Sequence, residues 1–389
     1  MSSPEFAAFS EAEHRERLQR ARQQLRAAGI ELCIAVAPED LYYLAGYDSW
    51  VSVNSPQALL FSVTQNDEPT LVVRDVDVVL ATESSWVKDI RSYHLYVDDV
   101  AALIAQVARE KGLMDGPVAM ELQSYALPHS LGCALTQALS PAHVIDATTS
   151  LGDLRVVKSA TEHGYTRQAA RYANYGLDAA RAALKSGIME IELAGAIEGA
   201  MRSAGSDYWS IPTELSSGLR TPGGHATPRD RAIQTGELVH MEFAGVHQRY
   251  HAVAIHTMAL GDPGSRARQV YEAVRTSLRA GLDVIRPGVA VSEVEQASLE
   301  PLRQRNLDEF ALMRFGYGIG IAYPPIWLET LQISRGFDRT LQPGMVFVLH
   351  GYVQLLDEGI GVIQGGTWAL TDSGLEMLVG GGDVGLEVI

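Results

Sequence analysis

The chain has 389 residues, which is enough for two domains and a substantial hydrophobic core. Hydrophobic residues make up 47% and charged residues 20%, and no apolar run approaches the roughly 20 residues of a membrane span, so we expect a globular protein outside the membrane. The formal net charge of −16 argues against nucleic acid as a partner and slightly favours a neutral or cationic small molecule.

Neither the N-terminus nor the cysteines indicate export. The first residues, MSSPEFAAFSEAEHRERLQRARQQ, contain no basic start followed by an apolar block, so we expect no signal peptide. Cys33 and Cys133 lie in apolar surroundings, and two scattered cysteines are too few for a disulfide framework or a zinc site. We therefore expect the protein in the cytoplasm.

Residues 1–153 are predicted to form an α/β domain, because strands and helices alternate along them. Apolar residues at spacings of three and four predict a helix over Glu11–Ala28, which Gly29 ends. A second amphipathic helix is expected over Asp98–Lys111. Short apolar runs predict strands at Leu32–Ala37, Ala58–Val63, Thr70–Val73 and Pro117–Met120.

A turn-rich loop, GYDSWVSVNSPQ (Gly46–Gln57), carries Trp50 in the middle of this domain. A tryptophan in such a loop usually covers local core. The alternative is a lid over a ligand, since loops on rigid scaffolds carry much function. The sequence leaves both interpretations open.

Residues 154–389 are predicted to form an α+β domain whose helices cover one face of a curved sheet. Within LRVVKSATE, Ser159 and Glu162 form a capping box that opens a helix just after the domain boundary. Ser292 and Glu295 are expected to cap a later helix. Further helices are predicted over Glu190–Ala204 and Arg266–Ile285, and strands over Gly316–Gly320, Met345–Leu355 and Gly361–Leu370.

The stretch GELVHMEFAGVHQRYHAVAIHTMALG (Gly236–Gly261) is predicted to form two strands joined by a short connection. In the first strand Met241 and Phe243 alternate with Glu242, so one face packs into a core while this carboxylate lies on the other. A carboxylate there is edge-exposed, salt-bridged or part of a site, and spacing alone leaves these options open. The second strand places on one face His251, Val253, Ile255 and Thr257.

This strand pair resembles the creatinase and methionine-aminopeptidase superfamily. Its metallopeptidases run roughly GDLV-x-x-DFG and then YHAD-x-x-RT, with each Asp a metal ligand, where this chain has GELVHMEFAG and YHAVAIHT. The superfamily's catalytic domain also begins with a run similar to LRVVKSATE. The resemblance implies a pita-bread fold for residues 154–389 and a smaller creatinase-like α/β domain for residues 1–153.

The chain departs from these metallopeptidases at their metal-ligand positions. Carried over one by one, the five ligands fall on residues of which only Glu242 and His350 could bind a divalent ion. A two-metal site needs several bridging carboxylates, so we expect no catalytic metal, no other cofactor and no metal-dependent Xaa-Pro peptidase. The five positions are Glu242, Val253, Tyr317 (GYGIG in place of GHGIG), His350 and Gln364.

A second resemblance identifies a candidate catalytic histidine. The segment GGHATPRDR (Gly223–Arg231) is similar to the segment that holds the superfamily's catalytic histidine, which implies this role for His225. Three motifs across both domains, GYDSW, EFAGVHQRYH and GYGIGIAYPPIW, are similar to those of ectoine hydrolases, a metal-free branch of the superfamily. The departures include Ile255, which replaces a creatinase substrate-binding Glu, and Gln364 and Gly365, which stand where acidic residues are expected.

These resemblances imply metal-free hydrolysis of a polarised C–N bond in a small cationic or zwitterionic amidine or guanidine. His225 would transfer the proton that the departing nitrogen needs, and Glu242 would attack the carbon or activate a water. Aromatic faces for a delocalised cation would come from Trp50, Tyr317 and Trp327. Candidates for orienting the substrate, each as readily a packed or surface residue, are Tyr250, His251, Tyr323, Glu329 and His350.

Two other functions remain open on the sequence. One is a creatinase-like amidinohydrolase, and the other is a catalytically inactive binding module, since pita-bread domains without metal also serve as binding modules. Retention of His225 and of a carboxylate at position 242 favours catalysis. The resemblance further implies a homodimer in which the Trp50 loop of one subunit closes the active site of the other.

Overall fold

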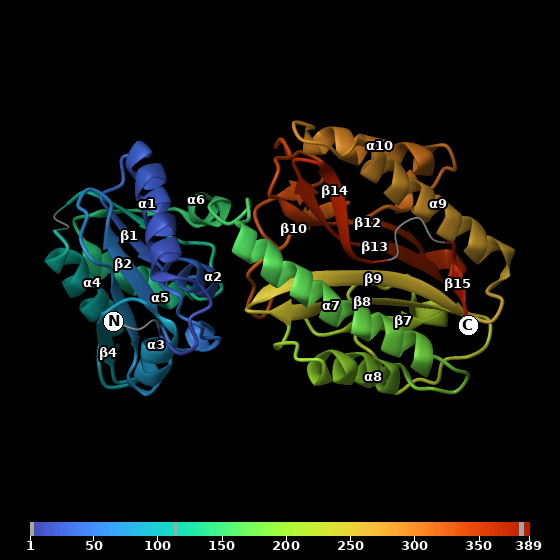
Figure 1. Ribbon diagram of the computed structural model, residues 1–389, viewed down its shortest axis with the longest axis horizontal. Helices are drawn as coiled ribbons and strands as arrows, with labels where there is room; N and C mark the ends of the chain where they lie inside the picture. Colours follow the sequence, from blue (N-terminus) through green and yellow to red (C-terminus); the bar gives the residue numbers. More distant parts are fainter. Residues whose placement is uncertain (1–3, 113–114, 381–384) are drawn as a thin grey trace. The chain divides into compact units, whose positions relative to one another are not determined.

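The computed structural model describes residues 4–112, 115–380 and 385–389, which divide into two compact units (Figure 1). The first unit is Met1–Arg155 and the second is Val156–Ile389. Each has its own sheet and its own hydrophobic core. In the described parts of the chain, no helix is both long and apolar enough to cross a lipid bilayer.

The first unit is an α/β domain, as predicted, built on a six-stranded sheet of order β4-β3-β2-β1-β5-β6. The sheet is mixed, because β1 runs antiparallel to β2 and parallel to β5. Its strands are β1 (Leu32–Ala35), β2 (Ala58–Ser62), β3 (Thr70–Arg74), β4 (Asp89–Tyr93), β5 (Pro117–Met120) and β6 (His143–Asp146). Its α-helices are α1 (Glu11–Ala27), α2 (Pro38–Asp40), α3 (Val78–Ser84), α4 (Val100–Glu110), α5 (His129–Leu139) and α6 (Thr148–Asp153), with short 3₁₀ or π turns at η1 (Leu41–Ala45), η2 (Val51–Val53) and η3 (Asp75–Asp77).

The second unit is an α+β domain, again as predicted, with a nine-stranded sheet of order β11-β10-β12-β13-β9-β8-β7 and with β14 beside β13 and β15 beside β9. Its strands are β7 (Glu214–Ser217), β8 (Glu237–His247), β9 (Tyr250–Leu260), β10 (Gly316–Gly318), β11 (Gln332–Ile333), β12 (Val346–Leu355), β13 (Ile360–Thr371), β14 (Gly374–Gly380) and β15 (Glu387–Val388). Its helices are α7 (Ala160–Ala183), α8 (Glu190–Ser203), α9 (Gly264–Val284) and α10 (Val291–Arg303), with 3₁₀ turns at η4 (Gly218–Arg220), η5 (Asp308–Phe310) and η6 (Leu356–Glu358).

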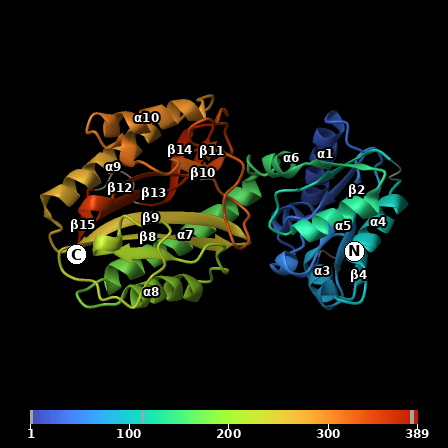
Figure 2. The ribbon, with the colours of Figure 1, turned by 180° about the vertical axis from the view of Figure 1, so that it is seen from behind.

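Two helix pairs cover the same face of this sheet. Figures 1 and 2 show α7 along β8 and β9 with α8 beside it, and α9 along β12 and β13 with α10 beside it. Met241 and Phe243 join the core with the first pair, and Leu349 and Trp368 join the core with the second pair. The opposite face carries a separate apolar cluster that includes Val253, Ile255, Val348 and Ile363.

The β8–β9 hairpin confirms the alternation predicted for the Gly236–Gly261 stretch. Phe243 faces the helices, and Glu242 lies on the opposite face. The two connecting residues, Gln248 and Arg249, both have positive φ values of 49° and 63°, which fits a tight two-residue turn. The Arg249 guanidinium lies 3.8 Å from the ring of Tyr208, so tertiary contacts hold a turn that lacks the usual glycine.

Most predicted helix ends agree with the structure, and one does not. The capping box of Ser159 and Glu162 is present at the start of α7, as predicted. The prediction that Ser292 caps α10 is wrong, because the N-cap residue is Ala290. Ala290 forms an antiparallel bridge with Thr340, and the helix begins directly after that bridge.

Candidate active site

A cavity of about 790 Å³ lies on the face of the second unit's sheet that the helices leave uncovered. Its walls come from β7, β8, β10 and β12 and from loops around residues 225, 313 and 327. Five side chains predicted from the sequence line it: His225, Glu242, Tyr317, Trp327 and His350. Two charged lining residues were missed by the sequence analysis, Glu214 and Arg314.

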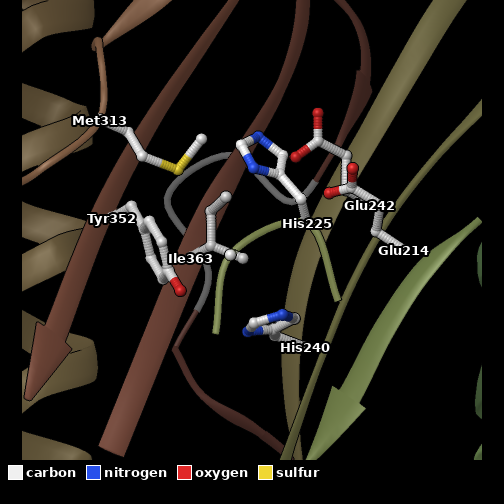
Figure 3. Close-up of a pocket in the computed structure, with 8 residues that line it drawn as sticks. Glu214, His225, His240, Glu242, Met313, Tyr352 and Ile363 are labelled. Atoms are coloured by element: carbon white, nitrogen blue, oxygen red, sulfur yellow. The ribbon is translucent and has the colours of Figure 1, made fainter. Parts of the chain in front are cut away.

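Two carboxyl groups project into this cavity from neighbouring strands. Glu214 of β7 pairs directly with Glu242 of β8. Paired residues of an antiparallel sheet point to the same face, so both side chains lie on the cavity side. Figure 3 shows the two carboxyl groups at the same wall as the His225 imidazole. The row of paired residues across the sheet is Glu214, Glu242, Ile255, Gly365 and His350.

Glu242 is held by a chain of hydrogen bonds. The Tyr317 hydroxyl donates to Glu242 Oε1 at 2.9 Å, and Trp327 Nε1 donates to the Tyr317 oxygen at 3.1 Å. Burial raises the pKa of Glu242 above its usual range, and the hydrogen bond from Tyr317 opposes that shift. A carboxyl poised in this way suits a nucleophile or general base that works near neutral pH.

Glu214 carries the more strongly perturbed of the two carboxyl groups. Burial raises its pKa, and the negative charge of Glu242 raises it further. No donor among the described residues hydrogen-bonds its carboxyl group, whereas Glu242 has Tyr317. Burial and the repulsion between two neighbouring carboxylates both oppose ionisation of the second group, so the pair favours retention of a proton. The β7 sequence ELSS contains no motif that would predict an active-site residue. The Glu214–Glu242 pair becomes visible only from the register of β7 against β8.

His225 lies in the loop between η4 and β8, in a strained backbone conformation. Its φ is +56°, in the left-handed region that residues with a side chain adopt uncommonly. The Tyr352 hydroxyl and the Gln354 amide donate to the carbonyl of Pro222 at 3.0 and 2.6 Å. These contacts from β12 fix the loop three residues before the histidine.

A buried glutamate at the start of α8 bonds the backbone just before the same loop and within it. Glu190 accepts hydrogen bonds from the backbone N–H groups of Ser217, at 2.9 Å, and Arg229, at 3.0 Å. It is also ion-paired with Arg220, whose Nη2 donates to the carbonyl of Thr227 at 3.0 Å. The loop that presents His225 is therefore anchored by the Glu190 carboxylate in addition to the contacts from β12.

The far side of the cavity combines a neutral histidine with an arginine. Burial, followed by the nearby charge of Arg314, lowers the pKa of His350 to about 3. Its Nδ1 has no hydrogen-bond partner within the described residues, and its ring lies 6.1 Å from that of Tyr317. Arg314 hydrogen-bonds Gln332, which also lines the cavity. The cavity thus offers carboxyl groups at one wall and a guanidinium at another.

The residues present do not fit the two-metal centre of the metallopeptidases. Val253 offers no donor atom, and burial holds the pKa of Tyr317 far above its usual range, so the phenol keeps its proton. Gln364 lies on the helix-covered face, where its amide contacts His256 Nδ1 at 3.2 Å. The described part of the chain contains no cluster of three or more His, Cys, Asp or Glu side chains suited to a metal ion.

The structure corrects the position predicted for the fifth ligand. Gly365, rather than Gln364, is the β13 residue that pairs with Ile255 and His350 on the cavity side. A Cβ atom at Gly365 would lie 2.5 Å from the Cβ of His350, so a side chain cannot be added there without displacing the strand. The physical reason for the error is that a shift of one residue moves a strand's side chain to the other face.

Tyr250 and His251 lie behind the cavity wall rather than in it. The Tyr250 hydroxyl donates to Glu162 at 2.7 Å inside the protein. His251 is fully buried, and its Nε2 accepts from the backbone N–H of Ser210 at 3.1 Å. Burial lowers its pKa to about 3, and its ring lies 6.2 Å from that of Trp327. The geometry gives these two residues a supporting position.

Tyr323 and Glu329 are likewise outside the described lining of the cavity. Tyr323 is fully buried, and the guanidinium of Arg249 lies 5.3 Å from its ring. Glu329 forms a buried ion pair with Lys158 at 2.5 Å. A Cβ atom at Gly320 would lie 2.3 Å from a Glu329 oxygen, which explains why the GYGIG motif ends on glycine.

Trp50 belongs to the first unit, where its side chain is 64% exposed directly before η2. It therefore does not cover the local core, which was one of the two interpretations of the sequence. Its role in closing the active site of a partner subunit stays a prediction.

Comparison with known proteins identifies the family. The sequence profile of metallopeptidase family M24 matches residues 164–372, and that of the creatinase/prolidase N-terminal domain matches residues 17–157. An uncharacterized hydrolase/peptidase of Sinorhizobium fredii is 30% identical over 95% of this chain and 96% of its own length. Ectoine hydrolase of Halomonas elongata is 28% identical over 95% of this chain and 96% of its own length.

Solved structures confirm the predicted pita-bread fold. A prolidase from Thermococcus sibiricus has a TM-score of 0.87 at 19% identity and covers 97% of this chain and 99% of its own. The dipeptidase PepE from Mycobacterium ulcerans has a TM-score of 0.82 at 25% identity and covers 98% of this chain and 99% of its own. With both of its domain profiles matched in order, the chain belongs to the hydrolases of metallopeptidase family M24.

Proposed function

We propose that the protein is a metal-independent hydrolase that cleaves a C–N bond, other than a peptide bond, in a small amidine or guanidine. The observation that carries this proposal is that Glu242 and His225 line one cavity while two of the metal-ligand positions on the same face, Val253 and Gly365, have no side-chain donor atom. The 28% identity to the ectoine hydrolase of Halomonas elongata supports a cyclic amidine as the substrate. We also propose that the enzyme is a cytoplasmic homodimer.

The proposed reaction needs an electrophilic amidine carbon held beside Glu242. The carboxylate of Glu242 either attacks this carbon, giving a covalent intermediate, or takes a proton from a water molecule that adds to it. His225 then gives a proton to the departing nitrogen, and the C–N bond breaks. In the covalent route a water then adds to the same carbon, the bond from this carbon to the Glu242 oxygen breaks, and the proton that the water loses goes to His225. In the other route Glu242 passes the proton it took from water to His225, so both routes restore the carboxylate and the imidazole.

The other lining residues support a flat, charged substrate. Tyr317 and Trp327 offer aromatic faces, which bind delocalised cations. Arg314 offers a guanidinium that suits a carboxylate on the same molecule. A zwitterion that carries an amidinium at one end and a carboxylate at the other matches both features.

The proposal is tested by incubating purified protein with a cyclic amidine, with creatine and with an Xaa-Pro dipeptide, and by identifying products by mass spectrometry. We expect a ring-opened product that differs from the cyclic amidine by one water. Proline release that depends on added metal would favour a peptidase. If a cyclic amidine binds but none of the three compounds is converted, the binding-module function replaces the hydrolase.

A further inference from the structure

Glu214 faces the cavity, yet the proposed reaction gives it no role. We propose that Glu214 and Glu242 form a two-carboxyl clamp for an organic cation, so that Glu214 selects an amidinium or guanidinium over a neutral compound of the same shape. The choice of an amidinium or guanidinium as the cation rests on the proposed function. Glu214 is added here as the side chain that recognises its positive charge.

The register of the sheet places the two carboxyl groups at the right separation for such a clamp. Glu214 and Glu242 are directly opposite on antiparallel strands, so their Cβ atoms are about 4.5–5.5 Å apart. Both side chains are partly buried and line the same cavity. An amidinium has N–H groups on both sides of its carbon and can donate to two carboxylates at once.

The pair has no cation partner within the described chain. Neither Glu214 nor Glu242 takes part in an ion pair there, and Tyr317 supplies one neutral hydrogen bond to Glu242 alone. Partly buried carboxyl groups are normally paired, because burying an unpaired charge is costly. Without a ligand, burial favours a proton on the pair, and a bound cation would take the place of that proton.

Two histidines near the pair are neutral, and the one arginine of the described lining, Arg314, hydrogen-bonds Gln332 and forms no ion pair with either glutamate. His350 is neutral because its pKa is lowered to about 3, and burial lowers the pKa of His240 to about 4. Glu190 of α8 faces the opposite side of β7 and is satisfied by Ser217. The remaining titratable or charged groups that line the cavity or the small pocket beside it are His225, Arg314, Tyr317 and Tyr352.

The clamp makes cation binding depend on pH in a defined direction. Burial and the charge of Glu242 raise the pKa of Glu214, so this carboxyl is protonated below that raised value. A bound cation favours the ionised form and expels the proton. Affinity for a cation should therefore rise with pH until Glu214 is ionised in the free protein, and then level off.

Calorimetry with benzamidinium and its neutral counterpart benzamide tests the clamp. In buffers of different ionisation enthalpy, we expect benzamidinium binding to release up to one proton near neutral pH, with affinity rising up to about tenfold per pH unit. Glu214→Gln should weaken benzamidinium binding about tenfold or more, abolish most of the proton release and leave benzamide binding unchanged. Glu198→Gln removes the same charge from α8, outside the described lining, and should change nothing.

Equal affinity of benzamidinium for the wild type and Glu214→Gln would overturn the clamp, as would binding without proton release between pH 6 and 8. If Glu214→Gln does not fold, the number of protons that the wild type releases on binding benzamidinium still tests the clamp. Benzamidinium binding is measured without any turnover, so the clamp and the proposed hydrolase function can be rejected independently of each other. Charge-selective binding without hydrolysis would reject the proposed function alone, and hydrolysis without charge selection would reject the clamp alone.

Discussion

Glu242 lies at the centre of a small set of side chains whose contacts determine its charge. Tyr317 donates to it, Trp327 donates to Tyr317, and Glu214 stands opposite on the next strand. The phenol favours the ionised form of Glu242, whereas burial favours the protonated form. The reactivity of the carboxyl at a given pH depends on the balance between these two effects.

Loss of either proposed catalytic group should be severe, and the losses should not add. Glu242→Gln keeps the shape but removes the charge, so kcat should fall by about 10³ or more while substrate still binds. His225→Ala should cost a comparable factor, and the double variant little more, because residues that act as one unit are not additive. Steady-state kinetics measures all three, and a loss below about tenfold for either single variant would refute its role.

Tyr317→Phe should change the pH dependence of the reaction rather than its maximum. Removing the hydroxyl removes the hydrogen bond that lowers the pKa of Glu242, so that pKa should rise. Activity that needs the ionised carboxylate would then be lost at a higher pH as the solution is acidified, and would recover toward the wild-type value in alkaline solution. A kcat/KM profile that falls equally at every pH would show that Tyr317 acts in another way.

The residues of the site differ in how far the sequence could reveal them. Alternation of Met241 and Phe243 with Glu242 predicted which face the carboxylate takes, because a strand has a period of two. Glu214 could not be found in the same way, since its place depends on pairing with a strand more than 20 residues away. Gln364 was assigned to the site although its side chain is on the other face, because a motif does not fix the register to one residue.

At the scale of elements, the loop that carries His225 depends on Glu190 at the start of α8. This carboxylate bonds the backbone at Ser217 before the loop and at Arg229 within it, and pairs with Arg220. Such an anchor allows an exposed histidine with positive φ to keep one position relative to β8.

Glu190→Gln should loosen this loop. The amide has a single oxygen and its nitrogen cannot accept, so the backbone N–H of either Ser217 or Arg229 loses its buried acceptor. We expect a loss of about 1–3 kcal/mol in the free energy of unfolding. Activity should fall more than binding, because the proton donor is displaced. Urea unfolding and steady-state kinetics measure the two effects, with Glu198→Gln on the same helix as the control. Unchanged stability together with unchanged kcat would show that the loop carrying His225 keeps its conformation without Glu190.

Local signals predicted most of the elements, and tertiary contacts explain the exceptions. The helices with clear apolar periodicity and the capping box at Ser159 were predictable from short stretches of sequence. The start of α10 was not, because a backbone bridge at Ala290 fixes it rather than the polar residue at Ser292. β7 was missed because its sequence ELSS has a single apolar residue and therefore no apolar run, unlike the equally short β1 and β5.

For the whole molecule, the central prediction beyond the single chain is a homodimer whose site includes Trp50 of the partner subunit. The exposed position of Trp50 on the first unit is compatible with such a contact. Trp50→Ala should raise KM or lower kcat while the stability of its own unit changes little, within about 0.5 kcal/mol. Sedimentation combined with activity measurement tests the assembly, and a fully active monomer would contradict it.

The most direct test of the account is the hydrolysis of a cyclic amidine by protein from which metal has been removed. The metal content and the rate should be measured on the same sample, after exhaustive chelation and again after addition of zinc, manganese or cobalt. We predict an unchanged rate with far less than one metal ion per chain, because the cavity keeps Glu242 and His225 but lacks the donors of a two-metal centre. Turnover that disappears with the metal and returns with it would contradict the account.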